Sequence, residues 1–292
     1  MKQDNTERLI AGIQHAVPHH LLSRLVGSLA ANKGMPNLKN KIIHWFIKRY
    51  QVDLSQAERE DPESYESFND FFTRSLKQGM RPLPEDAKQL VCPADGAISQ
   101  LGNIENGRIF QAKGHDYSLA DLLGGSEERA APFQGGKFAT IYLSPKDYHR
   151  VHMPIAGRLT QMVHVPGRLF SVNPLTARQV PNLFARNERV VAIFETEIGP
   201  VALVLVGAMI VAGIETVWSG LVTPPAGKEV QQWEYPEQVI KPICLERGDE
   251  MGRFLLGSTV IMLLPEGSSE WAENLTSESV VRMGQSMGQI LK

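Results

Sequence analysis

Hydrophobic residues recur at helical spacing along the first fifty residues. Residues 9–17, 21–29 and 38–46 each place their apolar side chains along one side of a helix. Pro18 and Pro36 interrupt the pattern between them. The three stripes are Leu9, Ile10, Ile13 and Val17; Leu21, Leu22, Leu25, Val26 and Leu29; and Leu38, Ile42, Trp45 and Phe46. The N-terminal part of the chain is therefore predicted to form amphipathic helices.

An aromatic stripe follows in residues 65–72. Tyr65, Phe68, Phe71 and Phe72 fall on one side of a predicted helix, and we interpret them as core side chains. The segment 80–84, which contains two prolines, then resembles a linker. These features predict a helical region over residues 1–80.

From residue 90 onward the hydrophobic period changes. Short apolar or alternating runs are separated by Gly, Pro, Asn and Asp, which is typical of strands joined by turns. The clearest runs are Ala97–Leu101, Phe138–Leu143, Val190–Phe194, Val201–Val206 and Val260–Leu264. The chain is therefore predicted to be an α+β protein. Its N-terminal helices precede a mostly antiparallel β core over residues 81–292, built as two packed sheets or a distorted barrel.

Composition adds little to this fold assignment. The 292 residues are 42% hydrophobic and 21% charged, which is ordinary for a globular protein. The two cysteines, Cys92 and Cys244, are too few for a disulfide framework and are expected to be reduced. No signal-peptide pattern is found at the N-terminus. The longest apolar run, residues 201–214, contains two glycines and is shorter than the ~20 residues of a spanning helix, so it predicts buried strands.

Charge is distributed unevenly along the chain. Residues 1–50 contain eight basic and two acidic side chains, although the whole chain has a net charge of −2. Such a basic segment favours an anionic partner, either a membrane surface or a nucleic acid. Basic polar faces beside Trp, Phe and Leu are typical of an interfacial helix. The alternative is that the apolar stripes simply pack against the core.

Three short segments contain candidate catalytic residues. They are Pro93-Ala94-Asp95-Gly96, the stretch from Tyr142 to Pro154 with His149 and His152, and Leu256-Gly257-Ser258-Thr259. Each has an ordinary structural explanation, because Asp-Gly and Gly-Ser are common in turns. Together, Asp95, His152 and Ser258 supply the residue types that orient an imidazole and activate a hydroxyl.

The same residues also suit two alternative chemistries. Two histidines at i and i+3 suit a metal site, but no further ligand lies close in the sequence, so no metal is predicted. The order Asp, His, Ser also fits a serine hydrolase. Ser258 is not in a Gly-x-Ser-x-Gly elbow, however, which makes the hydrolase less favoured.

The ordered motifs resemble the bacterial phosphatidylserine decarboxylases, which are pyruvoyl-dependent and membrane-associated. The resemblance runs from about residue 40 to residue 265. It is carried by Pro-Ala-Asp-Gly around Asp95, Asp147–Pro154, Gly167–Asn173, Asn182–Arg189, Ile214–Trp218, Met251–Phe254 and Leu256–Thr259. The preceding helices are also of the kind expected in this family.

The resemblance implies a catalytic group made from the chain itself. Ser258 would attack the Gly257 carbonyl, cut the chain into fragments 1–257 and 258–292, and become a covalent pyruvoyl group. No metal or pyridoxal phosphate would be needed. His152, held by Asp95, would accept the Ser258 proton, and His149 would supply a proton during decarboxylation or order the substrate. In substrate binding, Ser171 and Asn173 would hydrogen-bond the serine headgroup and Phe170 would cover the pocket. The alternative is that this segment is a plain β-turn followed by a strand.

The same resemblance implies the partners. The substrate would be phosphatidylserine, converted to phosphatidylethanolamine and CO2. The two fragments would form a heterodimer, which could assemble further. The basic helices would bind anionic lipid on the cytoplasmic face of the bacterial inner membrane.

Two other classes of function remain as alternatives. A soluble pyruvoyl decarboxylase acting on a small amino acid would self-cleave without needing amphipathic helices. A non-catalytic membrane or nucleic-acid module would explain the basic segment but not the motifs. Nucleic acid is not expected, because the segment lacks clustered Arg and strand-borne stacking aromatics.

Overall fold

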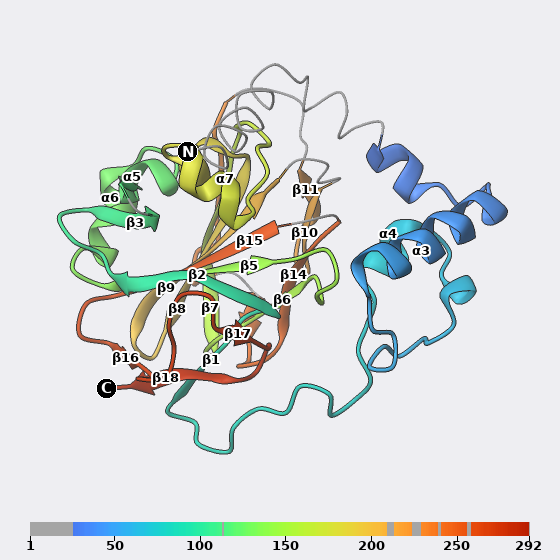
Figure 1. Cartoon of the computed structure of the whole chain (residues 1–292). Helices are drawn as coiled ribbons and strands as arrows, with labels where there is room; N and C mark the ends of the chain where they lie inside the picture. The colour runs from blue at the N-terminus through green and yellow to red at the C-terminus, as the bar shows by residue number, and fades with distance from the viewer. Residues whose placement is uncertain are drawn as a thin grey trace.

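The computed structural model describes residues 26–112, 114–208, 213–223, 229–238, 241–255 and 258–291. The apolar stripe of residues 9–17 and most of the stripe of residues 21–29 lie outside these residues. Residues 26–31 are helical. Helix α3 (Pro36–Tyr50), the 3-10 turn η1 (Pro62–Ser64) and helix α4 (Phe68–Phe72) follow and lie to one side of the β body (Figure 1).

The composition of α3 explains its ends and its packing. Pro36 is in its first turn, Lys48 and Arg49 lie in its last turn where they complement the helix dipole, and Gln51 ends it in a left-handed conformation. Ile43 and Phe46 are buried, whereas Trp45 is 59% exposed. The predicted apolar stripe is therefore divided, because Phe46 packs in the core while Leu38 and Trp45 face outward.

The aromatic stripe is in the core, as predicted. Tyr65, Phe68, Phe71 and Phe72 are all buried around Phe46, in a small cluster separate from those of the β body. The helix itself is shorter than predicted. Ser67 caps α4 by accepting a hydrogen bond from Asp70 N, so Tyr65 precedes the helix. Among the described residues, no helix is both long and apolar enough to cross a membrane.

The rest of the chain is mostly strand. The strands are β1 (Gln89–Val91), β2 (Gly96–Asn103), β3 (Arg108–Ala112), β4 (His115–Ser118), β5 (Lys137–Leu143), β6 (Arg150–His152), β7 (Gly157–Val165), β8 (Arg189–Thr196), β9 (Gly199–Gly207), β10 (Ile214–Thr216), β11 (Gly220–Thr223), β12 (Gln231–Glu234), β13 (Cys244–Leu245), β14 (Glu250–Phe254), β15 (Ser258–Leu264), β16 (Ser269–Trp271), β17 (Val280–Val281) and β18 (Ser286–Ile290). Short helices lie between them: α5 (Leu119–Leu122), α6 (Glu127–Ala130), η2 (Ala131–Phe133), α7 (Pro174–Gln179) and α8 (Leu183–Arg186). All five predicted runs form strands, namely β2, β5, β8, β9 and β15.

One large sheet organises the β body. Its strand order is β12-β7-β8-β9-β15-β5-β2-β17, with β13 paired to β7. A second sheet has the order β11-β10-β14-β6, and a third the order β1-β18-β16. The pairings of these named strands are antiparallel, and the large sheet does not close into a barrel among the described residues. The α+β class with packed, mostly antiparallel sheets is confirmed.

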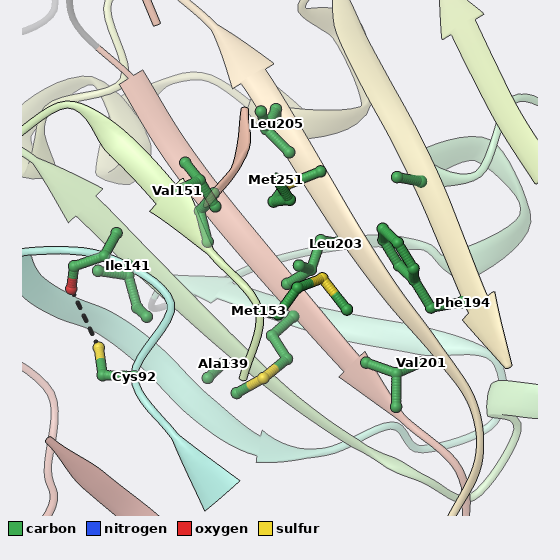
Figure 2. Packing of buried hydrophobic residues seen from close by; sticks show 14 of the residues in the cluster. Cys92, Ala139, Ile141, Val151, Met153, Phe194, Val201, Leu203, Leu205 and Met251 are labelled. Atoms are coloured by element: carbon green, nitrogen blue, oxygen red, sulfur yellow. Dashed lines mark hydrogen bonds between the residues drawn. The ribbon is translucent and has the colours of Figure 1, made fainter. Parts of the chain in front are cut away.

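Both faces of the large sheet are buried. Alternate residues of its central strands, such as Leu203, face the second and third sheets. They share one buried cluster with Val151, Met153 and Met251 (Figure 2). The intervening residues face the hairpin β3–β4 and helices α5, α7 and α8 on the other side (Figure 1). Strands covered on both faces become continuously apolar, which explains the unbroken run from Val260 to Leu264.

Strand β15 lies between β5 and β9 in this sheet. Ser258, its first residue, is opposite Leu143 of β5 and Gly207 of β9. All seven residues of β15 are buried. The fold therefore places the predicted nucleophile at one end of a strand that is hydrogen-bonded on both sides.

Candidate active site

The hydroxyl of Ser258 is buried and unpartnered. Ser258 is 1% exposed, and its Oγ has no hydrogen-bond partner among the described residues. A buried hydroxyl without a partner loses its hydration and gains nothing in return. Leu256 and Gly257 lie outside the described residues, so the predicted scissile bond is placed only from its Ser258 side. The site thus contains a hydroxyl that the fold leaves available for chemistry.

The loop 144–149 connects β5 to β6 and carries His149. It begins after Leu143, which pairs with Ser258, and it ends at His149, whose carbonyl accepts a hydrogen bond from Phe254 N at 3.0 Å. Phe254 is four residues before Ser258 in the chain. Both ends of the loop are therefore bonded to the segment that contains the predicted cleavage point.

His149 is neutral and has one unprotonated ring nitrogen. Its Nδ1 lies 2.8 Å from the carbonyl oxygen of Asp147. A carbonyl only accepts, so Nδ1 carries the proton and Nε2 has a bare lone pair. Complete burial, aided by the nearby Arg74 cation, lowers the pKa of His149 to about 3. Nε2 has no hydrogen-bond partner among the described residues.

His152 is held by two hydrogen bonds. Its Nδ1 donates to the carbonyl of Gly248 at 2.7 Å, and the hydroxyl of Tyr148 donates to its Nε2 at 3.0 Å. Burial lowers the pKa of His152, although the Gly248 carbonyl and the charges of Glu250 and Asp95 act in the opposite direction. His152 is therefore also a neutral imidazole with its proton on Nδ1, but its lone pair faces Tyr148.

Asp95 is held mainly by an arginine. Arg81 forms a bidentate ion pair with its carboxylate, and Met283 N donates to Oδ1 at 2.9 Å. Asp95 makes no hydrogen bond to His152 within the described parts of the chain. Its influence on His152 is through space, as a negative charge that favours the protonated ring. The backbone just before Asp95 contacts that of His152 directly, because His152 N donates to the Pro93 carbonyl at 2.8 Å.

The glycine after Asp95 serves a close approach between strands. A Cβ on Gly96 would lie 2.3 Å from the carbonyl oxygen of Tyr142. Gly96 begins β2, so the Asp-Gly pair marks the start of a strand. A cavity of about 270 Å³ opens at this point and is lined by Arg74, Arg81, Asp95 and Tyr148, among others. A polar ligand has room beside Asp95.

The segment 167–173 is connected by hydrogen bonds through Asn187 to Gly207, the last residue of β9, which lies opposite Ser258. Phe170 N donates to Asn187 Oδ1 at 3.0 Å, and Asn187 Nδ2 donates at 2.8 Å to the carbonyls of both Phe170 and Gly207. Gly207 pairs with Ser258. Phe170 is buried among core side chains, and Asn173 caps α7 by accepting from Thr176 N. Their contact with a substrate headgroup, and that of Ser171, stays a prediction.

Arg74, Arg81 and Tyr148 were not identified from the sequence. Tyr148 adjoins His149 in the chain, so its position within the motif was an available signal. Arg81 lies in a segment that was interpreted only as a linker, and Arg74 follows an aromatic helix. Neither arginine has a sequence pattern that indicates its partner.

Among the described residues, no group of three or more His, Cys, Asp or Glu side chains is arranged to hold a metal.

Comparison with known proteins gives consistent matches. The family model described as phosphatidylserine decarboxylase matches residues 68–289, and a model described as PSD matches residues 9–51. A phosphatidylserine decarboxylase proenzyme of Shewanella baltica is 60% identical over 285 residues, covering 97% of both chains. The proenzymes of Ectopseudomonas mendocina and Shewanella pealeana are 61% and 59% identical, and each match covers 97% of this chain and 98% or 99% of the relative.

The burial of His149 predicts a specific loss of stability in acid. An unfolded histidine binds a proton below pH 6.5, whereas folded His149 resists protonation until about pH 3. The unfolded state therefore binds more protons in this window, and stability falls as pH is lowered from 6.5 towards 3. His149→Gln should reduce the fall in urea midpoint between pH 7 and pH 5. His44→Gln, at an exposed histidine of α3, is the control. An equal acid loss in His149→Gln and the wild type would contradict the burial argument.

Proposed function

The chain belongs to the phosphatidylserine decarboxylase family, and we propose that it becomes active by cutting its own backbone between Gly257 and Ser258. As a member of this family it is a decarboxylase that acts on phosphatidylserine. The observation that carries the self-cleavage proposal is the buried, unpartnered hydroxyl of Ser258 at the start of β15. The proenzyme names of the similar proteins also support it, because they describe a precursor.

The proposed cleavage uses only groups of the chain and one water molecule. Ser258 Oγ attacks the Gly257 carbonyl carbon, the C–N bond breaks, and the peptide becomes an ester. Removal of the Ser258 α-proton then expels the Gly257 carboxylate, which ends fragment 1–257, and leaves dehydroalanine at position 258. Addition of water and loss of ammonia give a ketone at the start of fragment 258–292. Glycine at 257 has no side chain to obstruct the attack.

The surroundings of Ser258 fit a pyruvoyl group formed in this way. The residue is buried and anchored by strand pairing on both sides, so a group made from it would be held in place and shielded from water. Such a group supplies an electron sink for decarboxylation. Headgroup binding by Phe170, Ser171 and Asn173 is supported by the link between their segment and Gly207, opposite Ser258.

We assign the serine proton to His152 during self-cleavage. His152 is neutral, and the charges of Asp95 and Glu250 favour its protonated form once the proton arrives. The Tyr148 hydroxyl presently donates to its Nε2. Proton passage from Ser258 therefore requires Tyr148 to turn away or to act as a relay. Arg81 holds Asp95 in place for this role.

His149 is assigned to the decarboxylation step. Because its Nε2 is bare, it can hold a proton released by the ammonium group of phosphatidylserine, and the substrate carboxylate beside the ring would favour that charged form. It can return the proton to the α-carbon after CO2 has left. Its low pKa, which results mainly from burial, makes the protonated ring a strong acid that gives up its proton readily. The two histidines thus act at different stages.

The fragments are expected to remain together after cleavage. The small fragment contributes β15, which pairs with β5 and β9; β17, which pairs with β2; and β18, which pairs with β1. Most of these hydrogen bonds and the apolar residues of β15 lie in the core, away from water. A heterodimer of the two fragments therefore needs no covalent link.

The N-terminal region is assigned to the membrane surface. An apolar groove of about 300 Å³ lies between residues 26–31, α3 and α4, and it is lined by Leu29, Leu38, Trp45 and Phe72, among others. Lys41, Lys48 and Arg49 are exposed on α3. Apolar side chains beside exposed cations suit an anionic lipid surface. We place the enzyme on the cytoplasmic face of the bacterial inner membrane, with residues 1–80 as its docking region.

The cleavage proposal is tested by intact mass spectrometry. Purified wild-type protein should give fragments 1–257 and 258–292, and the smaller should resist Edman sequencing because its N-terminus has no amine. Ser258→Ala should remain one inactive chain. Ser269→Ala, which removes another buried and unpartnered hydroxyl, should cleave normally. An active, uncut wild-type chain that reacts with a fluorophosphonate would instead support a serine hydrolase.

The roles of the two histidines can be separated by comparing cleavage with turnover. His152→Gln should accumulate the uncut precursor. His149→Gln should be cut, but its decarboxylation rate should fall about 10²–10⁴-fold, which is the usual contribution of a positioned acid or base. His115→Gln, at a histidine of β4 outside the docking region and the catalytic site, should be normal in both assays. Wild-type cleavage in His152→Gln would contradict the role of His152 in self-cleavage. Wild-type turnover in His149→Gln would contradict the role of His149 in decarboxylation.

Membrane docking is tested by sedimentation with vesicles that contain phosphatidylserine. Replacing Lys48 and Arg49 with Gln removes two cations worth about 1 kcal/mol each near an anionic surface, so binding should weaken about 30-fold at low salt. Arg108→Gln with Lys137→Gln removes the same charge from β3 and β5 and should bind like the wild type. Equal weakening in both double variants would indicate that net charge alone governs binding.

A further inference from the structure

The short segment that follows α4 contacts the loop carrying His149. The Phe72 and His149 rings have centroids 4.0 Å apart. Arg150 donates to the Thr73 carbonyl at 2.8 Å and to Ser75 Oγ at 2.7 Å. Arg74 donates to carbonyls of the loop itself. The segment Phe72–Ser75 therefore connects the N-terminal helical region to the residues on both sides of His149.

Arg74 is the unusual member of this segment. It is 4% exposed, and its Nη2 donates to the carbonyls of Lys146 at 2.9 Å and Asp147 at 3.3 Å. Nε and Nη1 are buried without a hydrogen-bond partner among the described residues. Burial lowers the pKa of Arg74, but a guanidinium stays protonated in proteins. A buried cation with unpaired donors is costly, and stability alone does not explain why it is there.

Arg74 and His149 share one acceptor. The Asp147 carbonyl receives Nη2 of Arg74 and also Nδ1 of His149. Arg74 thus holds the oxygen that decides which ring nitrogen of His149 carries the proton. The same guanidinium acts on the ring as a nearby positive charge, which disfavours protonation of Nε2.

The other charged groups around His149 are already engaged. The Asp147 carboxylate accepts from Ser144 N and Ser144 Oγ, both at 2.7 Å. Arg150 pairs with Glu250, and Phe72 presents an apolar ring. Asp95 and Asp147 are near enough to Arg74 to favour its charge. Among the charged side chains of the described residues, Arg74 is the one whose charge shifts the pKa of His149.

We propose that Arg74 is a positioning residue that keeps His149 neutral, with its proton on Nδ1 and its Nε2 bare, so that the ring starts in one defined tautomer and a proton taken up at Nε2 is readily given up to the α-carbon. Arg74 acts through the Asp147 carbonyl and through its charge, and it does not touch the substrate. The inference rests on the decarboxylation role proposed for His149. It also gives the N-terminal helical region a direct connection to the catalytic site.

The test is the protonation state of His149, followed by NMR of protein labelled with ¹⁵N-histidine. The two ring nitrogens report the tautomer and the charge, and the signal is assigned by its loss in His149→Gln. In the wild-type enzyme His149 should remain neutral with Nδ1 protonated from pH 8 to pH 5. When the titration is continued towards pH 3, the midpoint in Arg74→Gln should lie about one pH unit or more above the wild-type value of about 3, because a nearby cation has been removed.

Two further variants separate charge from general damage. Arg74→Lys keeps the cation and should leave the His149 titration midpoint at its wild-type value. Arg59→Gln removes an arginine that binds Asp70 and the Ser64 carbonyl in the same helical region, without touching the 144–149 loop. It should leave the His149 titration unchanged. An upward shift in Arg59→Gln equal to that in Arg74→Gln would assign the effect to loosening of the region and overturn the proposal.

Two results overturn the proposal directly. One is a wild-type His149 that carries its proton on Nε2, which needs no variant to fold. The other is a folded Arg74→Gln protein whose His149 titrates like the wild type. These readouts do not depend on turnover. If His149→Gln retains full decarboxylation while the Arg74 shift is observed, the proposed role of His149 fails but the positioning by Arg74 stands.

Discussion

The pairing of β15 with β5 and β9 is the constraint on which the site depends. It fixes the backbone on the C-terminal side of the predicted scissile bond, because Ser258 is held between Leu143 and Gly207. The same pairing places the start of the loop that carries His149 next to Ser258. On the other side of Ser258, Gly207 is hydrogen-bonded through Asn187 to the segment of Phe170. A site that must remain ordered after its own backbone is cut needs such an anchor.

Burial determines the chemistry of the histidines. Removing an imidazole from water penalises its charged form, so both His149 and His152 are neutral, and either ring would give up an added proton readily. In each ring a backbone carbonyl fixes the proton on Nδ1. The difference lies at Nε2, which faces Tyr148 in His152 and has no described partner in His149. The two rings therefore share the same tautomer, but the Nε2 lone pair is bonded to Tyr148 in His152 and is free of described partners in His149.

The helical region and the β body are joined by arginines near this site. Arg81 reaches Asp95, Arg74 reaches the loop before His149, and Arg150 reaches back to Thr73 and Ser75. A guanidinium can satisfy several carbonyl or carboxylate oxygens at once, which suits it to the boundary between two packed regions. The region proposed to meet the lipid surface is thereby linked to the residues proposed to act on the lipid headgroup.

Local sequence patterns predicted the main strands, the aromatic core and the family. The strands β2, β5, β8, β9 and β15 and the buried aromatic cluster followed from hydrophobic spacing, and the family followed from the ordered motifs. The predicted direct contact between Asp95 and His152 is replaced by the Arg81 pair and an effect through space. Helix α4 is shorter than its stripe suggested, because the Ser67 cap sets its start. The stripe on α3 did not reveal that Phe46 would be buried and Trp45 exposed.

The sequence by itself determined which residue types are available and how each strand alternates, because side-chain period and turn chemistry are local properties. It therefore predicted Ser258, His149, His152 and Asp95 as the chemical groups. Only the tertiary structure decided which of them have partners. Arg74 and Arg81 are separated by many residues from the oxygens they bind, and no local pattern encodes a contact between distant segments. Burial of the imidazoles, and hence their neutral state, likewise arises only when the sheets and helices pack around them.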